Sequence, residues 1–410
     1  MALLAGAGKG FAFSSPPAVA RSARRANGRY LVGRAGGGGM SAAPSPSRNI
    51  DLPTTRAAAI APRLAELGAR YDAAPIFPID SMQCLAGANL HRCFAPVASG
   101  GLDFASAQAR HSAMFDVLRV IGRADLSVGR LYEGHVNAMI LFDHFGNPAQ
   151  HRVLAQRLDA GAFYGMWATE PPPGVRMTGP MLEGAKSFAT GAGWLAHAII
   201  TVQPEDGARQ LVVVAADDTT RADLSQWRVR GMRATGSGLY DLTGLMVTPD
   251  DMLGGPGDYD REPLFTTGAW RFTAVQLGGI EALLIETRKA MSDAARGDPV
   301  QRAKFADAVA ATRTAYLWVR EAALRAARDD ADGPAFARMT RGVVERAALD
   351  VMELAARIVG TRSAMDGQRI DKISRDLSLY LRQGGPGYAR DQAALAWLDH
   401  DAWGAEDLLW

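Results

Sequence analysis

The chain has 410 residues, with 48% apolar and 21% charged residues and a formal net charge of +2. This composition is typical of a globular protein of two or three subdomains, and it lacks the basic, aromatic-rich runs of a nucleic-acid binder. The only cysteines, Cys84 and Cys93, fall short of a zinc site even with His91, and no apolar run reaches the ~18 residues of a membrane span. We therefore expect a cytoplasmic protein without metal, nucleic-acid or membrane partners.

The first fifty residues contain no Asp or Glu but seven Lys or Arg residues. Such a segment buries too little apolar surface to fold by itself. It is either a transit peptide, which is rich in Arg and Ser and poor in acids, or an extension upstream of a start at Met40. We prefer the second interpretation and expect residues 1–50 to be disordered.

Helical periodicity dominates residues 51–163, where apolar side chains recur every three or four positions. One predicted helix covers 129–145 and ends at Gly146, with Pro148 just beyond. Residues 164–260 change to short β-branched runs. The runs 197–203 and 210–216 predict a hairpin, and 227–232 and 242–253 are expected to continue an antiparallel sheet.

Helices return over residues 261–403, before a short tail at 404–410. Apolar steps of three and four predict one helix that reaches Arg328 and another over 343–358. No G-x-G-x-x-G follows a strand, so a dinucleotide-binding α/β fold is not indicated. The order of elements therefore predicts the α+β class: a helical domain, a β-domain and a second helical domain.

The sequence WATEPPPG, residues 167–174, marks the first junction. Proline has no N–H to donate and is confined to strand edges and turns, so the strand should end near Glu170. The hydroxyl of Thr169 and the carboxylate of Glu170 therefore lie where the chain leaves the sheet. Backbone groups there are free to contact a ligand.

Several motifs in this order resemble the acyl-CoA dehydrogenase superfamily of FAD flavoproteins. Besides the Thr-Glu-Pro corner they are FGNPAQHR (145–152), LEGAKSFATGAGWLAHAIIT (182–201), GMRATGSG (231–238), IVGTRSA (358–364) and the Arg-Asp pair in SRDLSLYLRQ (374–383). The resemblance implies an N-terminal helical domain, a central antiparallel β-domain and a C-terminal four-helix bundle. Bundle helices that pair across subunits would give a homodimer or homotetramer.

The resemblance also implies a set of FAD contacts. Trp167, Ala168 and Thr169 would line the isoalloxazine, Phe188 would pack on the ring, and Thr190 would donate its hydroxyl near N5. A flavin takes up negative charge on reduction and therefore needs N–H or hydroxyl donors. Core packing of Phe188 and the strand preference of threonine are the alternative explanations.

For the pyrophosphate and adenosine, held in the family partly by a neighbouring subunit, the candidates are Arg296 and Gln301, with Gly360 and Thr361. Arg296 and Gln301 are explained equally well by an ordinary helix start, with Asp298 as N-cap and Pro299 in the first turn.

The catalytic residue of the family is a glutamate that removes a proton beside the thioester, with a pKa raised by burial. Of its two usual positions, one is Gly384 here and the other is Trp270, and neither is a carboxylate. Asp143, His144 and Glu170 are the substitutes that the sequence offers.

Three functions are compatible with this pattern. The main expectation is an FAD-dependent oxidoreductase that resembles acyl-CoA dehydrogenases and acts on an acyl-CoA. The alternative is a two-component flavin-dependent monooxygenase of the same superfamily, which needs no such base. The third is an inactive structural subunit. An electron-transfer protein or a flavin reductase would be the partner of either enzyme.

Overall fold

The computed structural model describes residues 52–205 and 207–398. The predictions for residues 1–50 and for the tail 404–410 lie outside these ranges. All the described helices and strands belong to the unit formed by residues 51–410. Among the described helices, none combines the length and apolarity needed to cross a bilayer.

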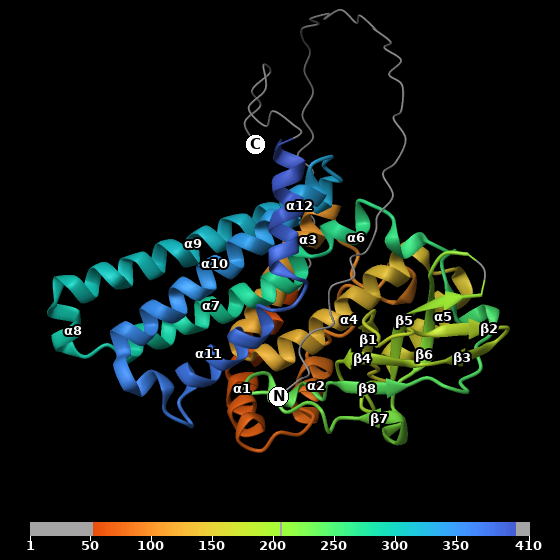
Figure 1. Cartoon of the computed structure of the whole chain (residues 1–410), viewed down its shortest axis with the longest axis horizontal. Helices are drawn as coiled ribbons and strands as arrows, with labels where there is room; N and C mark the ends of the chain where they lie inside the picture. Colours follow the sequence, from red (N-terminus) through yellow and green to blue (C-terminus); the bar gives the residue numbers. More distant parts are fainter. Residues whose placement is uncertain (1–51, 206, 399–410) are drawn as a thin grey trace, which may run out of the picture. The chain divides into compact units, whose positions relative to one another are not determined.

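Five helices come first: α1 (Pro53–Ala73), α2 (Ile79–Gly87), α3 (Ala107–Ala124), α4 (Leu126–Phe145) and α5 (Pro148–Asp159). The predicted helix ending at Gly146 is confirmed as α4. Helix α4 is buried along almost its whole length, because helices and strands surround it (Figure 1). It therefore carries side chains toward both the β-rich part and the C-terminal helices.

The strands form a six-stranded and a three-stranded sheet. The first contains β1 (Tyr164–Trp167), β2 (Arg176–Thr178), β3 (Met181–Glu183), β5 (His197–Pro204), β6 (Gln210–Ala215) and β9 (Met252–Leu253). The second contains β4 (Ala185–Ala189), β7 (Ala222–Asp223) and β8 (Gly238–Asp241). The predicted hairpin is confirmed as the antiparallel pair β5–β6, while β1 and β2 each add to β5 in parallel.

One predicted strand is wrong, and another is only partly confirmed. Residues 227–232 form a loop in which the Trp227 indole donates to the Met232 carbonyl. Gly231 in this loop lies against the Arg375 carbonyl, where a Cβ would come within 2.0 Å, so helix α11 (Arg369–Tyr380) occupies the place of a partner strand. Of residues 242–253 only β9 is a strand, because Pro249 begins a 3₁₀ turn that Thr248 and Asp251 cap.

The C-terminal helices are α6 (Leu264–Thr267), α7 (Trp270–Ala290), α8 (Asp293–Gly297), α9 (Pro299–Arg328), α10 (Gly333–Val359), α11 (Arg369–Tyr380) and α12 (Pro386–Leu398). The predicted end at Arg328 is confirmed, as is the start with Asp298 as N-cap. Helices α7, α9 and α10 run alongside one another, and α11 packs on α7 (Figure 1).

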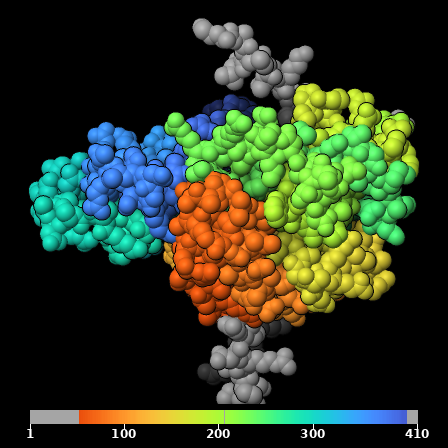
Figure 2. All heavy atoms as spheres, turned by 90° about the horizontal axis from the view of Figure 1, so that it is seen from below, coloured from red at the N-terminus to blue at the C-terminus, as the bar shows by residue number. Residues whose placement is uncertain are grey.

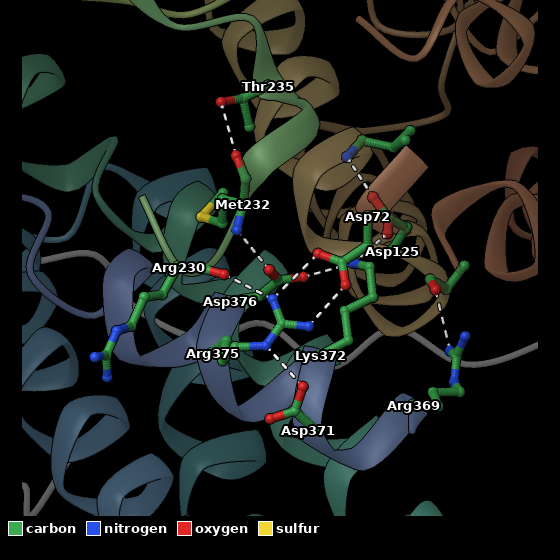
Figure 3. Close-up of polar contacts among 12 residues, drawn as sticks. Asp72, Asp125, Arg230, Met232, Thr235, Arg369, Asp371, Lys372, Arg375 and Asp376 are labelled. Atoms are coloured by element: carbon green, nitrogen blue, oxygen red, sulfur yellow. Dashed lines mark hydrogen bonds and ion pairs between the residues drawn. The ribbon is translucent and has the colours of Figure 1, made fainter. Parts of the chain in front are cut away.

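The Arg-Asp pair of the sequence joins α11 to the rest of the chain (Figure 3). The Arg375 guanidinium pairs with Asp72 of α1 at 2.7 Å and with Asp371. Asp376 accepts from the Met232 backbone N–H and from Lys372. The N-terminal helices also lie against the β-rich segments on the face that Figure 2 shows. These contacts fix α11 and the loop before β8 relative to α1.

Candidate functional site

The strand β1 ends in a tryptophan that faces inward. The Trp167 side chain is only 2% exposed, its indole packs 5.1 Å from the Tyr240 ring, and its Nε1–H donates to the Thr190 carbonyl at 3.0 Å. A ligand at this corner would therefore meet only the backbone of Trp167. The indole instead ties the end of β1 to the end of β4.

Beside this corner lies an open wall of three side chains, Thr169, Phe188 and Thr190. The Ser187 N–H donates to the Thr169 carbonyl at 2.9 Å, so the segment after β1 runs next to β4. Phe188 is 66% exposed and has φ +52°, a left-handed conformation that non-glycine residues rarely adopt. A large apolar side chain presented outward from a strained backbone suggests a binding surface.

Glu170 forms an ion pair with a buried lysine. Its carboxylate pairs with the Lys186 ammonium, which also donates to the Thr201 hydroxyl at 3.0 Å. Lys186 is fully buried, and this burial lowers its pKa. Gly174, at φ +93°, lies so close to Glu170 that a Cβ would come within 2.9 Å of the carboxylate. The acid of the Thr-Glu-Pro corner thus neutralises a buried lysine.

Neither expected base position carries an acid. Gly384 is exposed at φ +73° in the turn after α11, and a Cβ there would contact the Phe272 ring at 3.5 Å. Trp270 is fully buried, 5.8 Å from the His111 ring. Of the substitutes, Asp143 is paired with Arg110. Neither position therefore supplies the carboxylate that serves as the family's base.

A buried polar chain that sequence reasoning missed connects α4 with the start of α7. The Glu133 carboxylate, 2% exposed, accepts from Arg130 and from the Asn137 amide. The Asn137 carbonyl in turn accepts from the Arg271 guanidinium. Burial lowers the pKa of Arg271 to about 10. The signal available in the sequence was a charge within an otherwise apolar helix, which needs a buried partner.

Two buried hydroxyls lie behind the wall and connect to the hydroxyl of Thr190. Ser237 lies 3.3 Å from the Thr190 hydroxyl and 2.8 Å from that of Thr235. Thr235 and Ser237 are almost fully buried, so they contact Thr190 from the protein side. Of these three hydroxyls, only that of Thr190 was expected from the sequence.

The residues expected to hold the pyrophosphate lie at the far end of the helical bundle. The Arg296 guanidinium donates to the carbonyls of Met291 and Arg288, so it caps the end of α7. The buried Gln301 Oε1 has no hydrogen-bond partner among the described residues. Gly360 and Thr361 are exposed where α10 ends, and α10 packs along α9 (Figure 1).

A hollow of about 410 Å³ lies between α3, α7 and α9. Four arginines and one carboxylate line it, together with two aromatic rings and aliphatic side chains: Arg119, Arg123, Arg288, Arg313, Glu281, Phe305 and Tyr316 among them. Excess guanidinium charge beside rings suits an anionic, flat ligand. None of these side chains belongs to the wall of Thr169, Phe188 and Thr190.

Comparisons of sequence find two kinds of relative. Residues 263–390 match the family described as "Acyl-CoA dehydrogenase, C-terminal domain". A dibenzothiophene monooxygenase of Mycolicibacterium goodii is 26% identical over 311 residues, which are 64% of this chain and 74% of that protein. A dibenzothiophene monooxygenase of Rhodococcus erythropolis is 28% identical over 160 residues, 35% of this chain and 38% of its own length.

Comparisons of structure find the same fold in several enzymes. FMN-bound TdsC from Paenibacillus sp. A11-2 has a TM-score of 0.76 at 19% identity, covering 85% of this chain and 97% of that one. Methanesulfinate monooxygenase MsuC from Pseudomonas fluorescens has a TM-score of 0.72 at 20% identity, with 84% and 96% covered. A glutaryl-coenzyme A dehydrogenase complex has a TM-score of 0.75 at 17% identity, with 87% and 96% covered.

These comparisons confirm the α+β fold and the superfamily resemblance, and they correct the expected activity. The expectation of acyl-CoA dehydrogenase activity is wrong, because the relatives in sequence are monooxygenases. The broader expectation, that the chain is an oxidoreductase of a flavin-dependent superfamily, is confirmed.

Proposed function

We propose that this chain is a flavin-dependent monooxygenase. It has the fold of acyl-CoA dehydrogenases, and its residues 263–390 match that family's C-terminal domain. The observation that carries the proposal is the lack of a carboxylate at both base positions, Gly384 and Trp270. A dehydrogenase needs that carboxylate, and a monooxygenase does not. The relatives' names point the same way.

The open wall fits a flavin ring. Phe188 offers an apolar face for stacking, Thr190 offers a hydroxyl, and the backbone after Trp167, with Ala168 and Thr169, offers polar groups beside them. The nucleotide part is not specified by these residues: FAD was expected from the sequence, whereas a neighbour in fold is described as FMN-bound. We therefore propose a flavin and test both forms.

A bound flavin, reduced by a separate reductase, would supply the electrons that activate dioxygen. The residues of the chain would bind and orient it: Phe188 would pack on the ring, and Thr190 would offer its hydroxyl to it. The chain of Arg130, Glu133, Asn137 and Arg271 provides a polar, preorganised boundary between α4 and α7. One neighbour in fold is described as a complex with FMN and indole, which makes indole a suitable first substrate.

The test begins with uptake of FMN and FAD by the purified protein, followed through visible absorbance. The loaded protein is then mixed with a flavin reductase, NADH, ¹⁸O-labelled dioxygen, and either indole or dibenzothiophene. Labelled product is the expected result, with Thr190→Val about tenfold slower and still folded, the size of one lost hydrogen bond. Bleaching of the flavin by an acyl-CoA without reductase would refute the monooxygenase. A protein that takes up neither flavin would leave the structural-subunit hypothesis.

A further inference from the structure

We propose that Thr235 and Ser237 are positioning residues that allow Thr190 to act either as a hydrogen-bond donor or as an acceptor toward the bound flavin. The three hydroxyls form a chain that can reverse its direction. The inference rests on the proposed function, because it assigns Thr190 to the flavin edge.

The chain starts at a backbone carbonyl and ends at the open wall. The Thr235 hydroxyl lies 3.1 Å from the Met232 carbonyl and 2.8 Å from the Ser237 hydroxyl. Ser237 lies 3.3 Å from the Thr190 hydroxyl. Thr235 is 1% and Ser237 2% exposed, so bulk water does not compete for their hydrogen bonds.

Counting protons gives two arrangements of the chain: an inward one that makes all three contacts, and an outward one that gives up the contact with the Met232 carbonyl. Each hydroxyl has one hydrogen to donate. In the inward arrangement, Thr190 donates to Ser237, Ser237 to Thr235, and Thr235 to the Met232 carbonyl. In the outward arrangement, Thr235 donates to Ser237 and Ser237 to Thr190, which leaves the Thr190 hydrogen free for a ligand. The Phe188 carbonyl, 3.5 Å from the Thr190 hydroxyl, is too distant to hold that hydrogen firmly.

The carbonyl at the inner end tolerates both arrangements. When Thr235 turns away, the Met232 carbonyl still accepts from the Trp227 indole at 3.3 Å and from the Thr235 backbone N–H at 3.3 Å. A reversal therefore leaves no buried acceptor without a partner, the condition that would otherwise oppose it.

The inner end is also fixed in place. The Met232 backbone N–H donates to the Asp376 carboxylate, which Lys372 pairs with (Figure 3). Figure 3 shows this line of contacts running from α11 through Met232 to Thr235. The carbonyl that terminates the chain is thus held by α11, so reversal requires only the rotation of hydroxyl hydrogens.

A flavin makes use of both arrangements. In the oxidised ring N5 is an acceptor and suits the outward arrangement, in which Thr190 donates. In the two-electron-reduced ring N5 carries a hydrogen and suits the inward arrangement, in which Thr190 accepts. The relay of Thr235 and Ser237 thus lets one hydroxyl match both redox states without movement of the backbone.

The test is the two-electron midpoint potential of FMN bound to the full chain, which reports the ratio of the affinities for reduced and oxidised flavin. Thr235→Val keeps the shape of the side chain and removes the hydroxyl. The inward arrangement then leaves the Ser237 hydrogen without an acceptor, which costs more than a missing donor in the outward arrangement. We expect about tenfold weaker binding of reduced relative to oxidised FMN, and therefore a lower midpoint potential. Ser237→Ala should act in the same direction.

Two further variants separate the relay from a structural role. Thr235→Ser keeps the hydroxyl and should restore the wild-type potential. Thr287→Val removes a buried hydroxyl of α7 that bonds only within its helix and should leave the potential unchanged. An unchanged or raised potential in both Thr235→Val and Ser237→Ala would overturn the relay while flavin binding persists. If the wild-type protein takes up neither FMN nor FAD, the relay and the proposed function are both wrong. That result differs from an unchanged potential in a flavin-loaded variant, which would exclude the relay alone.

Discussion

The Lys372 ammonium lies 2.7 Å from the Asp125 carboxylate, although 247 residues separate them. It also lies 2.6 Å from Asp376, one turn further along α11. All three side chains are nearly buried. The two carboxylates raise the pKa of the lysine despite its burial, so the cation is retained between them. This cluster joins the α3–α4 junction to α11 and, through Asp376, to the loop that carries Met232.

The first prediction concerns this cluster. Lys372→Met leaves two nearby buried carboxylates without a cation, and loss of one partner of a buried pair costs about 3–5 kcal/mol. We expect a fall of that size in the free energy of unfolding, measured by urea denaturation. As a control, Arg346→Met removes an exposed i, i+4 pair with Asp350 and should change stability by less than about 1 kcal/mol. Equal effects of the two variants would contradict the structural role of Lys372.

Local patterns in the sequence predicted many of the helices and strands. The hairpin β5–β6 has two β-branched runs with a polar loop between them, and its pairing depends on neighbouring residues. The start of α9 is likewise local, since Asp298 and Pro299 cap it without help from elsewhere. The motifs at Trp167 and Asp376 then indicated the order of the domains along the chain.

The composition of the site could not be predicted in the same way. Residues 227–232 have the composition of a strand, but α11 lies where a partner strand would have to pair with them. No local pattern in the sequence indicates that contact. The hydroxyls of Thr235 and Ser237 meet Thr190 only because β8 pairs with β4. Glu133 and Arg271, which lie 138 positions apart in the sequence, come together through Asn137. Contacts of this kind depend on tertiary packing, which one sequence does not show.

The second prediction concerns the acid of the Thr-Glu-Pro corner. Glu170→Gln removes the counter-charge of the buried Lys186 and leaves it the Thr201 hydroxyl. We expect a loss of about 3 kcal/mol in the free energy of unfolding, with most of it regained in the double variant Glu170→Gln/Lys186→Met. Urea denaturation of the wild type, Glu170→Gln, Lys186→Met and the double variant measures both effects. A single variant as stable as the wild type would contradict this structural role. A double variant that is folded but inactive would instead indicate that Glu170 or Lys186 takes part in the chemistry.

The third prediction uses the backbone of Phe188. At φ +52° a side chain costs about 1 kcal/mol that glycine avoids. Phe188→Gly should therefore be more stable than Phe188→Ala by about 1 kcal/mol, the reverse of the usual order within a strand. Both variants should bind FMN about tenfold more weakly, because the stacking face is lost. Thermal unfolding without flavin and titration with FMN measure the two effects separately, and wild-type affinity in both variants would exclude Phe188 from the site.

The fourth prediction concerns pH. His135 of α4 is 1% exposed, its Nδ1 accepts from the Tyr164 N–H at 3.0 Å, and its Nε2–H donates to the His91 carbonyl. Acceptance at Nδ1 requires a neutral ring that carries its proton on Nε2. Burial lowers the pKa of His135 to about 4, from an ordinary value of 6.5. Between these two values the unfolded chain binds a proton that the folded chain does not, so the stability from this residue is complete above pH 6.5 and is lost as the pH falls toward 4.

The size of this loss depends on the two pKa values. It amounts to about 3 kcal/mol between pH 6.5 and 4. A glutamine at position 135 offers a neutral donor and acceptor but cannot take up a proton, so His135→Gln should unfold with a shallower dependence on pH in this interval. Carboxylates also titrate there, but they do so in both proteins, so the difference between the two curves isolates His135. Parallel curves of unfolding free energy against pH would mean that the ring is already charged in the folded protein, and that the Tyr164 N–H that joins α4 to β1 has another acceptor.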